Sequence, residues 1–394
     1  MIKVRGKTDA LLILIVVVLA IFGIIMVFSA SYYSTISMAQ GPYYYLQRAV
    51  QWAVVGLVVM IGASFIPYRI YYYLAPFIVI FSVIFLALLF TPLGHEVNGA
   101  VRWIKITEEL TFMPGEFAKF AVIIGVAWYY TKYADKTKTI GYGFFAVMVM
   151  AGVYFLLIYK QPNLSTALIV ALTIIMMMFI AGVNIGYIAG GLVFGALLGY
   201  TMIQNAAGFH MNRMTGFLDP FADAQGEFFQ TVQGLIALGS GGLMGVGLGN
   251  SVQKALWLPY AQNDFIFAII GEETGFIGCI LVLIAFVILI WRCMLIAMRS
   301  QDRFAMLLGS GVAILFALQV VMNIGVVTSI LPPTGVILPF ISYGGNAIIL
   351  FMLLIGIMLN IARGDGPETA AQLRKRDKRA SRRAERANRG EAAS

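Results

Sequence analysis

The chain has 394 residues, of which 60% are hydrophobic and only 11% are charged, and its mean hydropathy is +0.88. Soluble domains carry roughly 25% charged residues, and no aqueous fold of this length could cover so much apolar surface. The composition therefore excludes a soluble domain and predicts an all-α integral membrane protein.

A helix that crosses the hydrocarbon of a bilayer needs about 20 consecutive apolar residues. Ten segments meet this requirement, and in chain order they are residues 10–30, 48–66, 70–91, 117–133, 141–159, 163–181, 184–204, 265–291, 304–328 and 341–362. The sequence thus predicts about ten transmembrane helices in one membrane domain, residues 1–362, followed by a basic tail, residues 363–394.

The distribution of positive charge predicts the orientation of these helices. If the N-terminus lies inside, twenty of the 27 Lys and Arg residues fall on the inner side, ten of them in the tail. Inner loops of membrane proteins carry such an excess, so both termini are expected in the cytoplasm. A basic run can bind nucleic acid, but next to a membrane domain anionic lipid headgroups are the expected partner.

Two long segments, about 92–116 and about 205–264, then lie on the outer side. The second is rich in glycine, aromatic and amide residues. Long connections of this kind are usually functional or disordered, and this composition argues against disorder. The functional site is therefore expected on the outer face.

Several charged residues stand at or near the ends of the predicted helices, where charge is costly and often functional. Asp264 opens an apolar run, so it is either a helix N-cap or a partly desolvated carboxylate suited to act as a general base. Glu272 and Glu273 follow two turns later, and adjacent helical residues point about 100° apart. We expect at least one of them to meet a buried cation or backbone donor, and for Glu273 a structural ion pair is favoured.

Two further positions carry charge at the outer side. Glu116 and Lys119 are three residues apart and share a helix face, either as a plain ion pair or as part of a site. Arg102, beside Trp103, is either an interfacial anchor or a ligand for a diphosphate. The two histidines, His95 and His210, lack ligand-spaced partners, so no metal site is predicted from the residues.

The motifs around these residues resemble those of the SEDS proteins (shape, elongation, division and sporulation), the FtsW/RodA/SpoVE group of bacterial cell-wall polymerases. The resemblance covers nearly the whole chain. Its motifs are Arg102-Trp103, Pro114 to Lys119, Gln161-Pro162, Asp219-Pro220, Gln230 and Gln233, Gln253-Lys254, Leu258-Pro259, Asp264 to Phe267, Glu272 to Gly275 and Thr334 to Gly345. The segment from Asn323 to Gly345 is more similar to division and sporulation members than to RodA.

The resemblance implies a peptidoglycan glycosyltransferase that polymerises lipid II into glycan strands at the outer face of the membrane. It implies Asp264 as the catalytic carboxylate, with Arg102, Glu116 and Lys119 at the substrate diphosphate. It further assigns supporting roles to four residues, Gln233, Lys254, Glu272 and Ser342. A divalent cation, Mg²⁺ or Mn²⁺, is a possible cofactor with no clear ligand set in the sequence.

The resemblance also implies partners: the nascent glycan strand, a class B penicillin-binding transpeptidase and other division proteins. The chain departs from the family pattern at Asn163, Tyr260, Gln262 and Asn346, which leaves the finer roles around Asp264 open. Two other functions stay open: a lipid II flippase, which ten helices with charges would also fit, and a scaffold for the transpeptidase. The charges gather near the outer face rather than the midplane, which favours the polymerase.

Overall fold

The structure is a computed structural model that describes residues 9–37, 41–97, 100–105, 107, 111–193, 195, 217, 219–226, 228–255 and 257–364. Its main helices are α1 (Ala10–Ser37), α2 (Tyr44–Phe65), α3 (Arg69–Leu88), α4 (Pro114–Lys132), α5 (Ala146–Tyr159), α6 (Leu164–Ala181), α9 (Phe229–Ser240), α10 (Ile266–Arg299), α11 (Arg303–Val327) and α12 (Gly345–Arg363). Short helical turns occupy Ala134–Lys136, Ile140–Phe145 and Pro220–Asp223.

Eight helices in the described part of the chain are long and apolar enough to cross a membrane, which confirms a helical, multi-pass membrane fold. The predicted segment at 117–133 is also a helix, α4, but it is not among these eight. Most of the predicted segment at 184–204 lies outside the described residues, although 185–193 are helical. The count of ten therefore stays a prediction.

Several predicted boundaries were wrong, among them the end of the first helix, which lies at Ser37 rather than at residue 30. The helix expected to end at residue 291 continues to Arg299. The charge of Arg292 is paired with Asp9, the residue directly before α1, so the helix can continue past this position. The last helix begins at Gly345 rather than at 341. The residues before it form a turn in which Ser342 and Leu338 exchange hydrogen bonds.

A small antiparallel sheet lies in the first outer segment, where no strands were predicted. It has the order β1 (Gly94–Val97), β2 (Ala100–Lys105) and β3 (Thr111–Phe112), with a register shift between His95 and Glu96. Its third strand leads directly into α4. Asn346, at the start of α12, donates to the Thr111 carbonyl at 2.9 Å and ties the sheet to the bundle.

Two polar ties join α1 to α10 and frame the apolar part of the bundle. Arg292 Nε lies 2.9 Å from an oxygen of Asp9 at one end, and Ser29 Oγ donates to Glu273 at 2.6 Å near the other. At a rise of 1.5 Å per residue the two ties are separated by about 30 Å along α1. This separation is about the thickness of the bilayer hydrocarbon.

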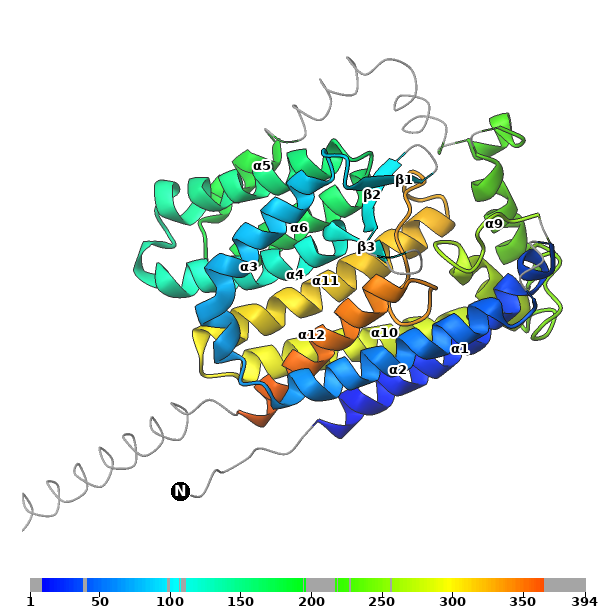
Figure 1. Ribbon diagram of the computed structural model, residues 1–394, viewed down its shortest axis with the longest axis horizontal. Coiled ribbons are helices and arrows are strands. Elements are labelled where there is room, and N and C mark those ends of the chain that lie inside the picture. Colours follow the sequence, from blue (N-terminus) through cyan, green and yellow to red (C-terminus); the bar gives the residue numbers. More distant parts are fainter. Residues whose placement is uncertain are drawn as a thin grey trace, which may run out of the picture.

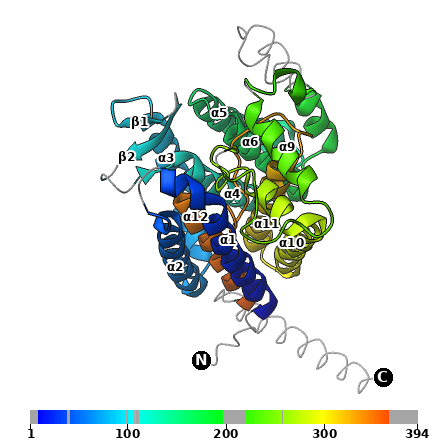
Figure 2. The same cartoon turned by 90° about the vertical axis from the view of Figure 1, so that its right-hand side faces the viewer.

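The end of the bundle that carries the sheet and α9 holds the two segments that the sequence predicts on the outer side, and we call it the outer end. In Figure 1 the start of α1 and the end of α12 lie together at the opposite end. Figure 2 looks onto the outer end, with α1, α2 and α12 below the sheet, and α10 and α11 below α9. Asp264 directly precedes α10 at this outer end, which is where the sequence predicts the site.

Candidate active site

Asp264 lies where the outer loop enters α10, and the backbone around it is held from two sides. Asn323 of α11 donates to the Asp264 carbonyl at 2.7 Å and to the Val336 carbonyl at 2.6 Å. Phe265 is the N-cap of α10, and no side chain caps the helix there. The alternative that Asp264 serves as the N-cap is therefore wrong, and its carboxylate remains available for another role.

Asp264 is half-buried, and the segment that precedes α12 lies against its carboxyl group. A Cβ atom added at Gly335 would lie 3.7 Å from Asp264 Oδ2, so the segment before α12 packs against this side chain. Burial raises the pKa of Asp264 from 3.8 to about 6, although the Arg102 charge acts in the opposite direction. A carboxylate of this pKa is ionised at neutral pH and is basic enough to accept a proton from a hydroxyl group in a transition state.

Arg102 approaches the site from strand β2, which lies on the other side of the bundle mouth from α9 (Figure 2). Its guanidinium donates to the Pro162 carbonyl in the turn between α5 and α6. The next residue, Asn163, caps α6 by accepting from Thr166 N at 3.3 Å. The sheet thus brings a cation from the first outer segment to the carboxylate at the end of the second.

Glu116 and Lys119 form the ion pair that their spacing predicted. Lys119 Nζ lies 2.6 Å from Glu116 Oε1, and both side chains are buried at the outer end of α4. The second oxygen, Oε2, is buried and has no hydrogen-bond partner within the described residues. The pair is fully assembled, and among the described residues one of its carboxylate oxygens keeps an unused acceptor.

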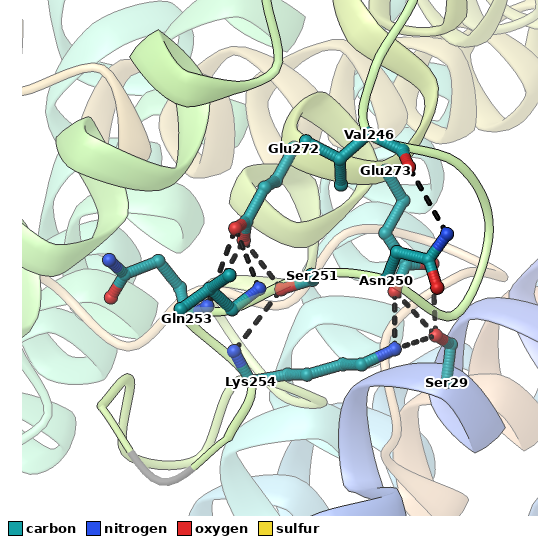
Figure 3. Close-up of polar contacts among 9 residues, drawn as sticks. Ser29, Val246, Asn250, Ser251, Gln253, Lys254, Glu272 and Glu273 are labelled. Atoms are coloured by element: carbon teal, nitrogen blue, oxygen red, sulfur yellow. Dashed lines mark hydrogen bonds and ion pairs between the residues drawn. The ribbon is translucent and has the colours of Figure 1, made fainter.

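Glu272 and Glu273 each hold a different part of the outer loop (Figure 3). Glu273 accepts from Lys254 Nζ at 2.6 Å, so the expected structural pairing of Glu273 is found. Glu272 accepts from the Ser251 hydroxyl and from Val252 N at 2.8 Å. The two adjacent carboxylates point to different partners, and together they fasten residues 251–254 to α10.

Gln233 and Ser342 lie at the same end of the bundle. Gln233 is half-buried on α9, where its neighbour Gly234 lets the helix approach the Phe265 ring: a Cβ atom there would lie 2.8 Å from that ring. Ser342 accepts from Leu338 N at 2.8 Å and is fully buried. Ser342 fixes the turn before α12, and within the described ranges neither side chain hydrogen-bonds the Asp264 carboxylate.

Arg48 of α2 is a second cation near the site that sequence reasoning did not single out. It stacks over the Tyr44 ring with 4.9 Å between Cζ and the ring centroid, and it hydrogen-bonds the side chain of Tyr343. Tyr343 N in turn donates to the Gln262 carbonyl at 2.9 Å, two residues before Asp264. The sequence feature that could have indicated Arg48 is its place among aromatic residues at the outer end of a predicted span.

The donor set does not favour a resident metal ion. Throughout the described ranges, no group of three His, Cys, Asp or Glu side chains is placed to hold one. Asp264 has a guanidinium rather than a second carboxylate beside it. The proposed reaction therefore has no step assigned to a metal.

A comparison with known families identifies the group to which this architecture belongs. The family model for FtsW, RodA and SpoVE, described as "Cell cycle protein", matches residues 9–365. The chain belongs to the FtsW/RodA/SpoVE family. The multi-pass helical fold described above agrees with this membership.

Two relatives in this family align with almost the whole chain. A probable peptidoglycan glycosyltransferase FtsW of Trichlorobacter lovleyi is 38% identical over 361 residues, which cover 91% of this chain and 94% of that protein. Stage V sporulation protein E of Bacillus subtilis is 35% identical over 361 residues, or 91% and 98% of the two chains. Both division-type and sporulation-type members are therefore similar to this chain.

Solved structures show the same fold. A chain from a peptidoglycan synthase complex that coordinates polymerization and crosslinking superposes with a TM-score of 0.77 at 26% identity, covering 92% of this chain and 99% of that one. RodA of Thermus thermophilus superposes with a TM-score of 0.66 at 24% identity, covering 91% and 97%. The second likeness is one of fold alone.

Proposed function

We infer that this protein is a peptidoglycan glycosyltransferase that polymerises lipid II at the outer face of the cytoplasmic membrane, in septal wall synthesis during division. Family membership and the names of the FtsW relatives support this activity. The observation that carries it to a residue is the desolvated carboxylate of Asp264, whose pKa is raised to about 6 next to a cation.

Asp264 acts as the general base in the proposed reaction. It takes the proton from the 4-hydroxyl of the acceptor sugar as that oxygen attacks the anomeric carbon of the lipid-linked donor. The bond between this carbon and the diphosphate oxygen breaks, and undecaprenyl diphosphate leaves with the bonding electrons. The activated diphosphate supplies the free energy, so no nucleotide is required.

The leaving diphosphate needs positive charge, because negative charge develops on it as the bond breaks. Arg102 is the proposed principal ligand, since its guanidinium lies at the mouth of the bundle and acts on Asp264. Lys119 contributes its charge from the start of α4, where Glu116 fixes its ammonium group. Arg48 is a further candidate from the opposite side of the site.

The proposed orientation places this site outside the cell and both termini in the cytoplasm. Arg69, Arg292 and Arg303 lie at the end of the bundle opposite to Asp264, in contact with Asp302, Asp9 and the Tyr130 carbonyl, respectively. A concentration of basic residues is typical of the cytoplasmic side. Both substrates carry polyprenyl tails, which suits a site at the outer boundary of the hydrocarbon.

A class B penicillin-binding transpeptidase is the proposed protein partner. The similar chain in the peptidoglycan synthase complex works beside a crosslinking activity, and a strand polymerase needs such an activity to join its product to the wall. Membrane lipids and the nascent glycan strand complete the set of proposed partners.

The test is reconstitution of the full chain with its cognate transpeptidase in proteoliposomes that contain labelled lipid II. The proposal predicts glycan strands that grow with time and lipid II that stays in its original leaflet. Movement of intact lipid II between leaflets without polymer would overturn the polymerase and support the flippase.

A further inference from the structure

Gln319 of α11 is a buried amide for which the described part of the chain provides no partner. Its side chain has no exposed surface, and neither Oε1 nor Nε2 has a hydrogen-bond partner within the described residues. Buried amide groups are almost always hydrogen-bonded, because leaving them unpaired is costly. An amide that is unsatisfied at both atoms indicates that a group from outside the chain completes it.

The packing of α11 against α4 places Gln319 level with Glu116. The two helices run antiparallel, since Arg303 Nε donates to the Tyr130 carbonyl at 3.1 Å and a Cβ atom at Gly311 would lie 2.7 Å from the side chain of Ile123. Eight residues along α11 are thus matched by seven along α4. The same register carried another eight residues to Gln319 reaches Glu116, whose Oε2 is also unsatisfied.

The same face of α11 carries Asn323 one turn farther out. Residues four apart on a helix are neighbours, and the Asn323 amide holds the backbone carbonyl of Asp264. Asn323 Oδ1 is a third buried oxygen without a partner in the described part of the chain. Gln319 therefore lies about 6 Å below the level at which Asn323 holds Asp264.

The unsatisfied atoms have a definite chemical preference. Glu116 Oε2, Gln319 Oε1 and Asn323 Oδ1 are acceptors, and Gln319 Nε2 is the one donor. A diphosphate offers only hydrogen-bond acceptors, so it cannot donate to these three acceptor oxygens. A sugar with hydroxyl and acetamido groups offers several O–H and N–H donors together with acceptors for Nε2.

We propose that Gln319, Glu116 Oε2 and Asn323 Oδ1 form a subsite for the hydroxyl and N-acetyl groups of the lipid-linked amino sugar, adjoining Lys119, one of the cations proposed to bind its diphosphate. Gln319 determines specificity in this subsite, which opens between the outer ends of α4 and α11 when the sugar binds. The proposal rests on the proposed function, because it takes the substrate to be an amino sugar on a polyprenyl diphosphate.

Binding to full-length protein carrying Asp264→Asn tests the subsite without turnover, so the result does not depend on polymerase activity. The two probes are lipid II and undecaprenyl diphosphate, which lacks the sugars. Gln319→Leu should weaken lipid II binding about tenfold, the effect of losing one or two hydrogen bonds. It should leave undecaprenyl diphosphate binding unchanged, and Gln319→Asn should recover part of the lipid II affinity.

Ser310→Ala is the matched control, because Ser310 Oγ is also buried and unsatisfied on α11 but lies nine residues deeper. It should affect neither probe. If Gln319→Leu changes both probes equally, or changes neither, then the amide binds structural water or shapes the helix interface, and the sugar subsite is refuted. Failure of the proposed function would instead appear as wild-type protein that binds lipid II without polymerising it.

Discussion

Lys254 Nζ lies 2.6 Å from Glu273 Oε1, and both side chains are almost wholly buried. Ser29 of α1 touches both groups, donating to Glu273 at 2.6 Å and accepting from Lys254 at 2.9 Å. Three segments that are far apart in the sequence therefore meet at one ion pair: α1, the loop that leads to Asp264, and α10. This pair holds the loop in place ten residues before the proposed catalytic carboxylate.

Breaking this pair from one side should destabilise the protein more than removing it entirely. Lys254→Met or Glu273→Gln alone leaves a buried charge or donor without its partner, which costs about 3–5 kcal/mol. The double variant leaves no net charge and should recover most of the lost thermal stability. Melting temperatures of the three variants in one detergent provide the measurement. If the double variant instead loses as much stability as the two single variants combined, the two residues do not interact.

Gly275 lies where the glycine-rich turn after α9 touches α10. Its φ of 68° is unfavourable for other residues, and an added Cβ atom would lie 2.3 Å from Gly245 N. Gly275→Ala should therefore lower the melting temperature strongly and loosen the turn. Gly239→Ala on α9 is the control, because a Cβ atom there meets nothing within 4 Å. A normal melting temperature for Gly275→Ala would mean that the turn does not need this close contact.

Much of the fold follows from the sequence because apolar length and charge are direct physical requirements of a bilayer. The helices near 70–91, 163–181 and 304–328 are found with small shifts of their ends. The sheet at 94–112 could not be predicted in this way, because its strands are short and one of them has only two residues. The kink at Gly275 depends on a contact with Gly245 that no local pattern reveals.

The candidate site was predictable only in part. The spacing of Glu116 and Lys119 predicted their ion pair, and the exclusion of a common partner for Glu272 and Glu273 agrees with their separate contacts. The position of Arg102 opposite Asp264 depends on how the sheet sits over the bundle, which is a long-range feature. The isolation of Gln319 was invisible as well, since a single amide in an apolar run has no period or spacing.

The raised pKa of Asp264 predicts the acid limb of the pH–rate profile. A general base must be deprotonated, so kcat/KM should fall about tenfold per pH unit below about 6. A carboxyl with the ordinary value of 3.8 would keep full activity to about pH 4. Polymerisation measured between pH 4.5 and 8 gives the profile. A plateau extending down to pH 4.5 would contradict the assignment of a desolvated base.

Asp264→Asn should leave the protein at least as stable as the wild type. The pKa of Asp264 is higher in the folded protein than its ordinary value, so the ionised carboxylate opposes folding at neutral pH. The stability of the wild type should therefore rise as the pH falls through about 6 toward 4. Asp264→Asn removes the charge and this pH dependence, which melting temperatures at pH 5 and 7.5 would reveal. A variant that melts far below the wild type would indicate a structural role for the carboxylate.

The decisive measurement of the role of Asp264 is the polymerisation of labelled lipid II. Wild type and Asp264→Asn are compared, each purified with its cognate class B transpeptidase. Asn263→Asp is the control for local disturbance, because it alters the neighbouring side chain and keeps Asp264. The account predicts long glycan strands from the wild type and from this control, and a loss of at least about 100-fold in rate for Asp264→Asn. Full activity in a well-folded Asp264→Asn protein would contradict it.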